Sequence, residues 1–499
     1  MSLKIYNTLH RKKELFKPIE DGKVRMYICG PTVYNYISVG NSRPVIVFNM
    51  VRNYLEFLGY KVEYIQNITD IEDKIIKKAN EEGVDYRIIT DRYIKAFHND
   101  IKNLKVGGFS GMPLATDMIP EIIGIVKKII ANGYGYEVDG NVYFEVGKFP
   151  GYGKLSGQDI TEMRNTDEND FEKRNKVDFA LWKKAREGEP SWDSPWGKGR
   201  PGWHIECSAM STTLLDRSID IHGGGIDLIF PHHENEIAQS EAAFPEGGSF
   251  VKYWMHNGMI EVKEGKMSKS LGLKKNWVLK NLLEMFSPET IKMYVLSTHY
   301  RSPLEFSMKK LNEAEKAVEK ITNTMGNLKF LIKQADKLPG SDTGEEAAAD
   351  IISRFASFTE RLESDFKKSM DDDFNSAKAI GSIFEFVKNV NNIIQKPDFK
   401  ISTSLKDSLC SAYNKMEELG KVLGLNFKRE TTETKKNLKD RTEIKKEDIE
   451  KLIKDRETAR DNKDFKKADK IRNYLYLKGI VLEDRKEGTI WKLKDSDEI

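Results

Sequence analysis

Hydrophobic and polar positions near the start of the chain predict strands on either side of one helix. The runs 24–29 (VRMYIC) and 61–69 (KVEYIQNIT) are short and rich in β-branched and aromatic residues, which is typical of strands. Between them, the run 43–59 (RPVIVFNMVRNYLEFLG) has the spacing of an amphipathic helix that ends at Gly59. This order indicates an α/β fold, a Rossmann-like doubly wound parallel sheet that binds ligands where its strands end. Cys29 lies at such an end.

The pattern changes twice further along the chain. Residues 74–200 mix helical stretches with a hairpin-like run, YEVDGNVYFEV, and are predicted to be an insertion into a sheet domain that spans 1–303. Residues 304–425 are predicted to form an all-helical bundle, because apolar residues recur there at steps of three and four, as at Leu311, Ala314, Val318, Ile321, Met325 and Leu328. Residues 426–499 are predicted to be a polar linker and a small helix–hairpin module, with Gly488 in the turn.

Composition narrows the class of protein without naming a function. The chain has 499 residues, of which 32% are charged, and a formal net charge of +3, which neither requires nor excludes a polyanionic partner. No apolar run is long enough to cross a bilayer, and the N-terminus lacks the apolar core of a secretory signal, so a cytoplasmic protein without membrane contact is expected. Three cysteines, an odd number, argue against a disulfide framework.

The run PHHENEIAQ places two histidines beside two acidic residues. It does not match the H-E-x-x-H helix of zinc proteases, because no second His lies four residues after the first. It does place His232 and Glu236 at positions i and i+4, on one face of a helix, where they would form half of a tetrahedral metal site. His233 is expected to point to a different face.

Two other stretches have residue types that suit polyphosphate. In GKMSKSLG, Lys266 and Lys269 flank Ser268 on a Gly-edged loop, and flexible ammonium groups can neutralise charge that builds up on phosphate in a transition state. In CGPTVYNYISVGNSR, Gly40 stands where the first helix begins, and exposed amides at a helix start favour phosphate. Taken alone, each is also typical of an ordinary solvated loop or turn.

Together these stretches resemble the class I aminoacyl-tRNA synthetases. Longer ordered runs are similar to the cysteinyl-tRNA synthetase family, namely MYICGPTVYNY, YIQNITDIEDKIIKKANEEG, GRPGWHIECSAM, DIHGGGIDLIFPHHENEIAQSEAAF and GKMSKSLG. The resemblance covers the catalytic part closely and the helical C-terminal region more loosely. It implies a cysteine–tRNA ligase that forms cysteinyl-adenylate from ATP and L-cysteine, releases pyrophosphate and transfers cysteine to the 3′ end of its tRNA.

The resemblance also implies one zinc ion per chain. Its ligands would be Cys29, Cys207, His232 and Glu236, and zinc accepts all three of these ligand types. Zinc binds a soft thiolate far better than a hydroxyl, so it would select cysteine over serine, which a hydrophobic pocket separates only weakly. The alternative is that both cysteines are core thiols and that His232 pairs locally with Glu236.

Further roles follow from the same resemblance. Lys266, Ser268 and Lys269 would act on the phosphates together with Mg²⁺. Gly40 and Asn41 would seat ATP, with Ser38 and Lys269. The amino acid and its adenylate would contact Gly30, Thr69, Trp203, His222 and Asp227. The helical bundle would bind the tRNA anticodon region, and a monomer is expected.

One departure from the family pattern stands in the first signature. Where the family usually has His-Ile-Gly-His or His-Ile-Gly-Asn, this sequence has Ser38-Val39-Gly40-Asn41, so a shorter neutral donor replaces a phosphate-binding His. Loss of one such contact would cost on the order of 10² to 10³ in rate. Two alternatives stay open: a ligase that couples cysteine to an amino sugar, and a catalytically inactive paralogue that binds RNA.

Overall fold

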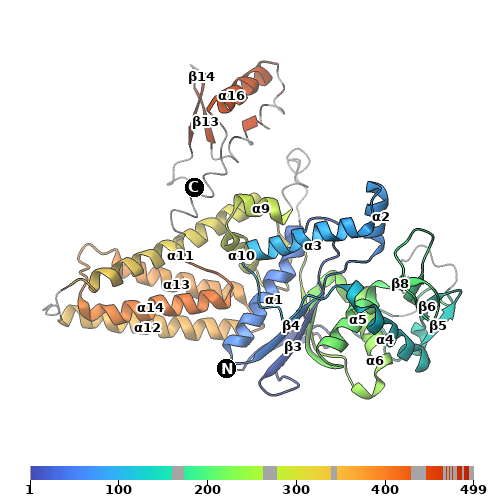
Figure 1. Ribbon diagram of the computed structural model, residues 1–499. Helices are drawn as coiled ribbons and strands as arrows, with labels where there is room; N and C mark the ends of the chain where they lie inside the picture. The colour runs from blue at the N-terminus through green and yellow to red at the C-terminus, as the bar shows by residue number, and fades with distance from the viewer. Residues whose placement is uncertain are drawn as a thin grey trace. The chain divides into compact units, whose positions relative to one another are not determined.

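The computed structural model describes residues 2–159, 173–261, 278–338 and 345–428, together with 446–462 and shorter stretches up to Leu493. These residues form two compact units, a large one that ends at Phe427 and a small C-terminal one (Figure 1). The run at 266–270 and most of the predicted polar linker lie outside the described residues. No helix in the described part of the chain is both long and apolar enough to span a membrane.

A parallel sheet forms the centre of the large unit. Its strand order is β10-β9-β3-β4, and its neighbouring strands are parallel throughout. The strands are β3 (Lys23–Ile28), β4 (Lys61–Gln66), β9 (Ile219–Gly225) and β10 (Val251–Asn257). Helix α1 (Val39–Phe57) connects β3 to β4 and packs against β4, β9 and β10 (Figure 1). The predicted Rossmann-like parallel sheet is therefore confirmed.

The segment predicted as an insertion contains helices and a second, antiparallel sheet of order β5-β6-β7-β8. The predicted hairpin corresponds to β5 and β6. Phe144 and Trp182 of this segment share one buried core with Tyr27 and Ile65 of the parallel sheet, so the two parts pack as one body. The elements are α2 (Asp73–Glu82), α3 (Tyr86–Asn103), η1 (Ala115–Met118), α4 (Ile119–Ala131), β5 (Gly135–Val138), β6 (Asn141–Phe144), η2 (Val146–Lys148), β7 (Phe179–Lys184) and β8 (Gly199–Pro201).

Two helices after the antiparallel sheet return the chain to the parallel one. These are α5 (Trp203–Leu214) and α6 (Glu234–Ala243), which pack against each other. Shorter elements complete the catalytic part: β1 (Lys4–Asn7), β2 (Lys12–Leu15), η4 (Ile226–Leu228), η5 (Ile229–His233), η6 (Pro245–Gly247), β11 (Ile260–Glu261), α9 (Leu279–Met285), α10 (Pro288–Leu296) and β12 (Leu304–Glu305).

Four long helices follow, as Figure 1 shows to the left of the sheet. They are α11 (Met308–Ala335), α12 (Glu345–Met370), α13 (Ser376–Ile394) and α14 (Lys406–Val422), with the short η7 (Thr403–Leu405) before α14. The six apolar positions of α11 that the spacing assigned to the core are all buried. Helix α14 also packs against α1, which joins the bundle to the sheet.

The small C-terminal unit contains α16 (Lys446–Asp461) and the antiparallel pair β13 (Ile480–Arg485) and β14 (Gly488–Leu493). The predicted hairpin is present. The prediction that Gly488 supplies its turn is wrong, because Gly488 is the first residue of β14 and pairs with Arg485.

A buried carboxylate fastens the bundle to the catalytic part. Asp373, in the turn between α12 and α13, is 0% exposed. Its carboxylate accepts hydrogen bonds from the Tyr6 amide at 2.8 Å, the Tyr300 hydroxyl at 2.8 Å and Arg301 Nε at 2.7 Å. Three segments far apart in sequence therefore depend on one side chain.

We expect Asp373→Ala to destabilise the large unit by about 3 kcal/mol, because it leaves buried donors and the Arg301 charge unpaired. The midpoint of thermal unfolding should fall by about 5 °C, measured by circular dichroism. The neighbouring Asp372 is matched in charge but half-exposed, and it pairs with Lys13 at the surface. Asp372→Ala should cost less than about 1 kcal/mol, and equal effects of the two variants would contradict this account.

Candidate metal centre and active site

Four side chains from distant parts of the chain meet at the carboxyl ends of the parallel strands. Cys29 follows β3, and Cys207 lies on α5. His232 lies in η5, just before α6, and Glu236 lies in the first turn of α6. Cys29 Sγ lies 3.8 Å from Cys207 Sγ and 3.6 Å from Glu236 Oε1, and His232 Nε2 lies 3.1 Å from the same Oε1. All four residues are buried. Their ligand atoms all lie within 4.8 Å of one another.

Most polar residues of the run PHHENEIAQ have a defined partner. While His232 and Glu236 face the cluster, the Glu234 carboxylate points away and accepts from the amides of Gly153 at 2.9 Å and Ser156 at 2.8 Å. On the next turn, Gln239 Oε1 accepts from Ser208 Oγ on α5 at 2.7 Å. The run therefore presents ligand atoms on one face while its other faces fasten α6 to its neighbours.

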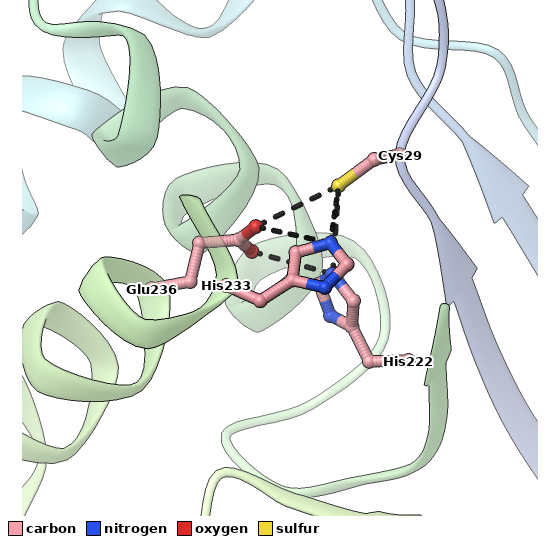
Figure 2. A group of neighbouring side chains, drawn as sticks. All are labelled: Cys29, His222, His233 and Glu236. Atoms are coloured by element: carbon pink, nitrogen blue, oxygen red, sulfur yellow. Dashed lines mark hydrogen bonds and ion pairs between the residues drawn. The ribbon is translucent and has the colours of Figure 1, made fainter. Parts of the chain in front are cut away.

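A second group of donors overlaps the first. Figure 2 shows His222 and His233 directed at the same Cys29 and Glu236. His233 Nε2 lies 3.3 Å and His222 Nε2 3.6 Å from Cys29 Sγ, and His222 Nε2 lies 3.4 Å from Glu236 Oε2. The expectation that His233 points to a different face is wrong, because positions three and four residues before Glu236 both lie within its reach on a helical turn.

The two groups differ in what covers them. His222 and His233 are 0% exposed and pack against the buried Trp254. His232 instead lies under the ring of Trp203, with ring centroids 4.4 Å apart, and Trp203 is 37% exposed. The His232 side of the cluster is therefore nearer to the surface than the His222 side.

Burial and charge set the protonation of the donors. Burial lowers the pKa of His222 to about 4 and that of His233 well below its usual value, which leaves both imidazoles neutral. Burial also acts to lower the pKa of His232, but the Glu236 charge and the Cys207 thiol raise it to about 10.

The two thiols are shifted in opposite directions. Burial and the neighbouring Cys207 raise the pKa of Cys29, while the hydrogen bond from Cys29 lowers the pKa of Cys207 to about 7. Two thiols, an imidazole and a carboxylate are a ligand set that zinc accepts, and a dication would balance the acidic groups. The donor chemistry of the cluster therefore fits a metal ion.

The predicted nucleotide end lies at the start of α1. Ser38 caps this helix: its hydroxyl accepts from the Asn41 amide at 3.2 Å, and Asn41 Oδ1 accepts from the Ser38 amide at 3.0 Å. Gly40 lies in the first turn. Val278, the first described residue after the run that contains Lys266, Ser268 and Lys269, pairs with Ser38. The three residues of that run lie outside the described residues.

Of the predicted substrate contacts, His222 is part of the cluster, and Gly30 and Trp203 lie beside it. Gly30 donates its amide to Asn67 Oδ1 at 2.8 Å, and a Cβ at Gly30 would lie 1.6 Å from the Asn67 carbonyl oxygen, so close chain packing alone requires this glycine. Thr69 is buried three residues beyond β4, and its amide donates to the Pro31 carbonyl. Asp227 is exposed.

Two buried charged residues escaped the sequence analysis. Arg43 on α1 is 0% exposed, and its guanidinium donates to the carbonyls of Gly258 at 2.6 Å, Met259 at 2.9 Å and Ser302 at 2.6 Å, which holds α1 against the strands β11 and β12. Glu206 on α5 is 1% exposed. A charged residue inside an otherwise apolar run was the available signal for both.

Comparison with known proteins agrees with this geometry. Residues 15–316 match the family described as tRNA synthetases class I (C) catalytic domain, 365–428 match the DALR domain, and 446–491 match the cysteinyl-tRNA ligase anticodon binding domain. A cysteine–tRNA ligase of Trichlorobacter lovleyi is 47% identical over 99% of this chain and 100% of that protein. Another, of Thermodesulfovibrio yellowstonii, is 45% identical over the same shares of both chains.

Solved structures with little sequence identity share the fold. Methionyl-tRNA synthetase of Mycobacterium tuberculosis bound by methionyl-adenylate is 13% identical, covers 80% of this chain and 92% of its own, and has a TM-score of 0.57. An arginyl-tRNA synthetase from Campylobacter jejuni, described as putative, covers 83% of this chain and 95% of its own with a TM-score of 0.55. The chain therefore belongs to the cysteinyl-tRNA synthetase family of class I aminoacyl-tRNA synthetases.

Proposed function

We propose that this chain, a cysteine–tRNA ligase by family, uses a zinc ion held by Cys29, Cys207, His232 and Glu236 to select L-cysteine. The observation that carries the proposal is the meeting of two thiols 3.8 Å apart with an imidazole–carboxylate pair at 3.1 Å, at the ligand-binding edge of the sheet. Of the two overlapping groups, the one with His232 is preferred because it lies nearer to the surface, beside Trp203.

Zinc supplies an affinity for thiolate sulfur that it does not have for a serine hydroxyl. The chain's own residues do the rest of the selection. Trp203 covers His232 with its ring and would shield the substrate side chain from water. The fastened faces of α6 keep His232 and Glu236 in register with the two cysteines.

The nucleotide end completes the proposed active site. The Ser38 and Asn41 side chains each accept from the other residue's backbone amide at the helix start, so the amides of Val39 and Gly40 are the ones proposed to face phosphate, and Gly40 allows close approach. Lys266, Ser268 and Lys269 are proposed to neutralise phosphate charge with Mg²⁺, and Asp227 to contact the adenylate. In this scheme the cysteine carboxylate attacks the α-phosphorus and pyrophosphate leaves, so the protein contributes positioning and charge rather than a nucleophile.

The second half-reaction needs tRNA. The matches to the DALR domain and to the anticodon binding domain support the proposal that the bundle and the C-terminal unit bind cysteine tRNA. A monomer acting in the cytoplasm remains a prediction. The two alternatives, an amino-sugar-coupling ligase and an inactive RNA-binding paralogue, are not favoured, because the named cysteine–tRNA ligases match over nearly the whole chain.

Purified protein should exchange pyrophosphate with ATP when given cysteine and not when given serine. We expect a preference of at least about 10⁴-fold in kcat/KM, because a hydrophobic pocket alone would give roughly 10²-fold. The exchange assay is repeated after chelation of the metal and after zinc is restored. A preference that survives complete removal of the metal would contradict a selecting role for zinc.

Replacement of one thiol should remove metal and selectivity together. Cys207→Ser is expected to weaken zinc binding by at least about 10²-fold and to raise the KM for cysteine, because it removes one of the four proposed metal ligands. Cys410→Ser is the matched control, since Cys410 lies partly exposed on α14 in the bundle. Metal content and exchange kinetics are measured for both. Zinc loss with unchanged discrimination would make the ion merely structural.

Metal affinity should rise with pH. Without metal, the pKa of Cys29 lies well above its usual value and that of His232 is about 10, so both groups hold protons at neutral pH. The metal must displace these two protons and, because the pKa of Cys207 is about 7, part of a third, so affinity should increase by between about 10² and 10³-fold per pH unit between pH 6 and pH 7. Competition with a chelator of known proton affinity measures this slope. An affinity independent of pH would show that the ligands carry no displaceable protons.

A further inference from the structure

Glu206 is a buried carboxylate without a partner beside the proposed active site. The residue is 1% exposed. Among the described residues, neither of its side-chain oxygens has a hydrogen-bond partner. Burying a carboxylate in this way is unfavourable unless a partner is supplied, and such groups are rare in native proteins. A ligand is one source of the missing partner.

The position of Glu206 points to the amino acid site. It precedes Cys207 on α5 and follows Trp203 by three residues, so it lies on the same stretch of helix as both. On its other side is Thr69: burial raises the pKa of Glu206 well above its usual value, its acidic neighbours raise it further, and the nearby Thr69 hydroxyl opposes this rise. Thr69 lies three residues beyond β4, and its backbone pairs with that of Thr32, just beyond Cys29. Glu206 therefore lies between the end of β4 and the proposed metal ligands.

The charges around Glu206 favour a cation as the partner. Its strongest charged neighbours are Cys207, Asp70 and Glu72, which are all acidic. Asp70 accepts from the Thr116 hydroxyl at 2.6 Å, and Glu72 accepts from the Lys74 amide at 2.9 Å. Asp70 and Glu72 thus each have a donor, whereas neither oxygen of Glu206 has one within hydrogen-bond geometry in the described part of the chain.

We propose that Glu206 binds the α-ammonium group of the amino acid substrate. This inference rests on the proposed function, since the thiol of the same molecule would lie at the metal ligands next to Cys207. An ammonium group has three donors and a full positive charge, which suit two unpartnered carboxylate oxygens. A thiol without an ammonium group would leave Glu206 buried and unpaired. Glu206 would thus reject simple thiols, as the metal rejects serine.

Three small probes separate the two contacts: cysteamine, 2-mercaptoethanol and ethanolamine, each tested as an inhibitor of cysteine-dependent pyrophosphate exchange by the zinc-loaded protein. Cysteamine has both groups, 2-mercaptoethanol lacks the ammonium, and ethanolamine lacks the thiol. We expect cysteamine to bind at least about tenfold more tightly than 2-mercaptoethanol, because a charge-assisted hydrogen bond contributes about that factor. Equal binding of these two would overturn the inference even if no variant were made.

The variant Glu206→Gln assigns the effect to the residue. It should remove most of the preference for cysteamine over 2-mercaptoethanol and raise the KM for cysteine at least about tenfold. Glu72→Gln is the matched control: it removes a charge from the same group of acids but from a carboxylate that has a partner, and its preference should stay within about twofold of wild type.

Zinc content and the thermal midpoint are measured beside the inhibition. A Glu206→Gln protein with normal zinc and an unchanged preference for cysteamine would overturn the assignment, as would equal weakening of both thiols. Failure of the zinc proposal looks different, because cysteamine and ethanolamine would then bind alike. The two comparisons therefore test the ammonium contact and the thiol contact separately.

Discussion

Burial of two thiols, an imidazole and a carboxylate in one small volume is the constraint on which the catalytic part depends. Inside a protein these acidic groups repel one another and cannot be screened by water, so they stay together only if a cation or bound protons balance them. The shifted pKa values of Cys207 and His232 are the effect of that crowding. A bound dication would neutralise the repulsion among these acidic groups. Such an ion would also bind sulfur at the ligand-binding edge of the sheet.

The scaffold meets this constraint by fixing the elements that carry the ligands. Cys29 is set by a central strand of the parallel sheet. Helix α6 is fastened through Glu234 to the turn at 153–156 and through Gln239 to α5. Because the antiparallel sheet shares its core with the parallel one, the turn that holds Glu234 is itself anchored. Rigidity of this kind is what a site needs if it is to separate sulfur from oxygen.

Local patterns predicted the fold well, since strands, helices and the core face of α11 each have a signature within a few residues. The same is true of the pairing of His232 with Glu236, which are four residues apart. What could not be predicted depends on chain segments that meet only after folding. The contact of His233 with Cys29 joins residues 204 positions apart, and Arg43 and Glu206 owe their burial to strands and loops distant in sequence. The role of Gly488 was predicted wrongly, because the sequence alone does not distinguish a glycine within a hairpin turn from one in the strand beside it.

The contact between the Tyr6 amide and Asp373 joins residues 367 positions apart. A ribosome adding about 5–20 residues per second reaches Asp373 roughly 20 to 70 seconds after Tyr6. The Tyr6 amide therefore lacks this hydrogen-bond partner until the turn between α12 and α13 has been synthesised. Assembly of this enzyme closes a loop through about three-quarters of the polypeptide, and nascent chains cut short before that turn would lack this contact between the N-terminal strand and the bundle.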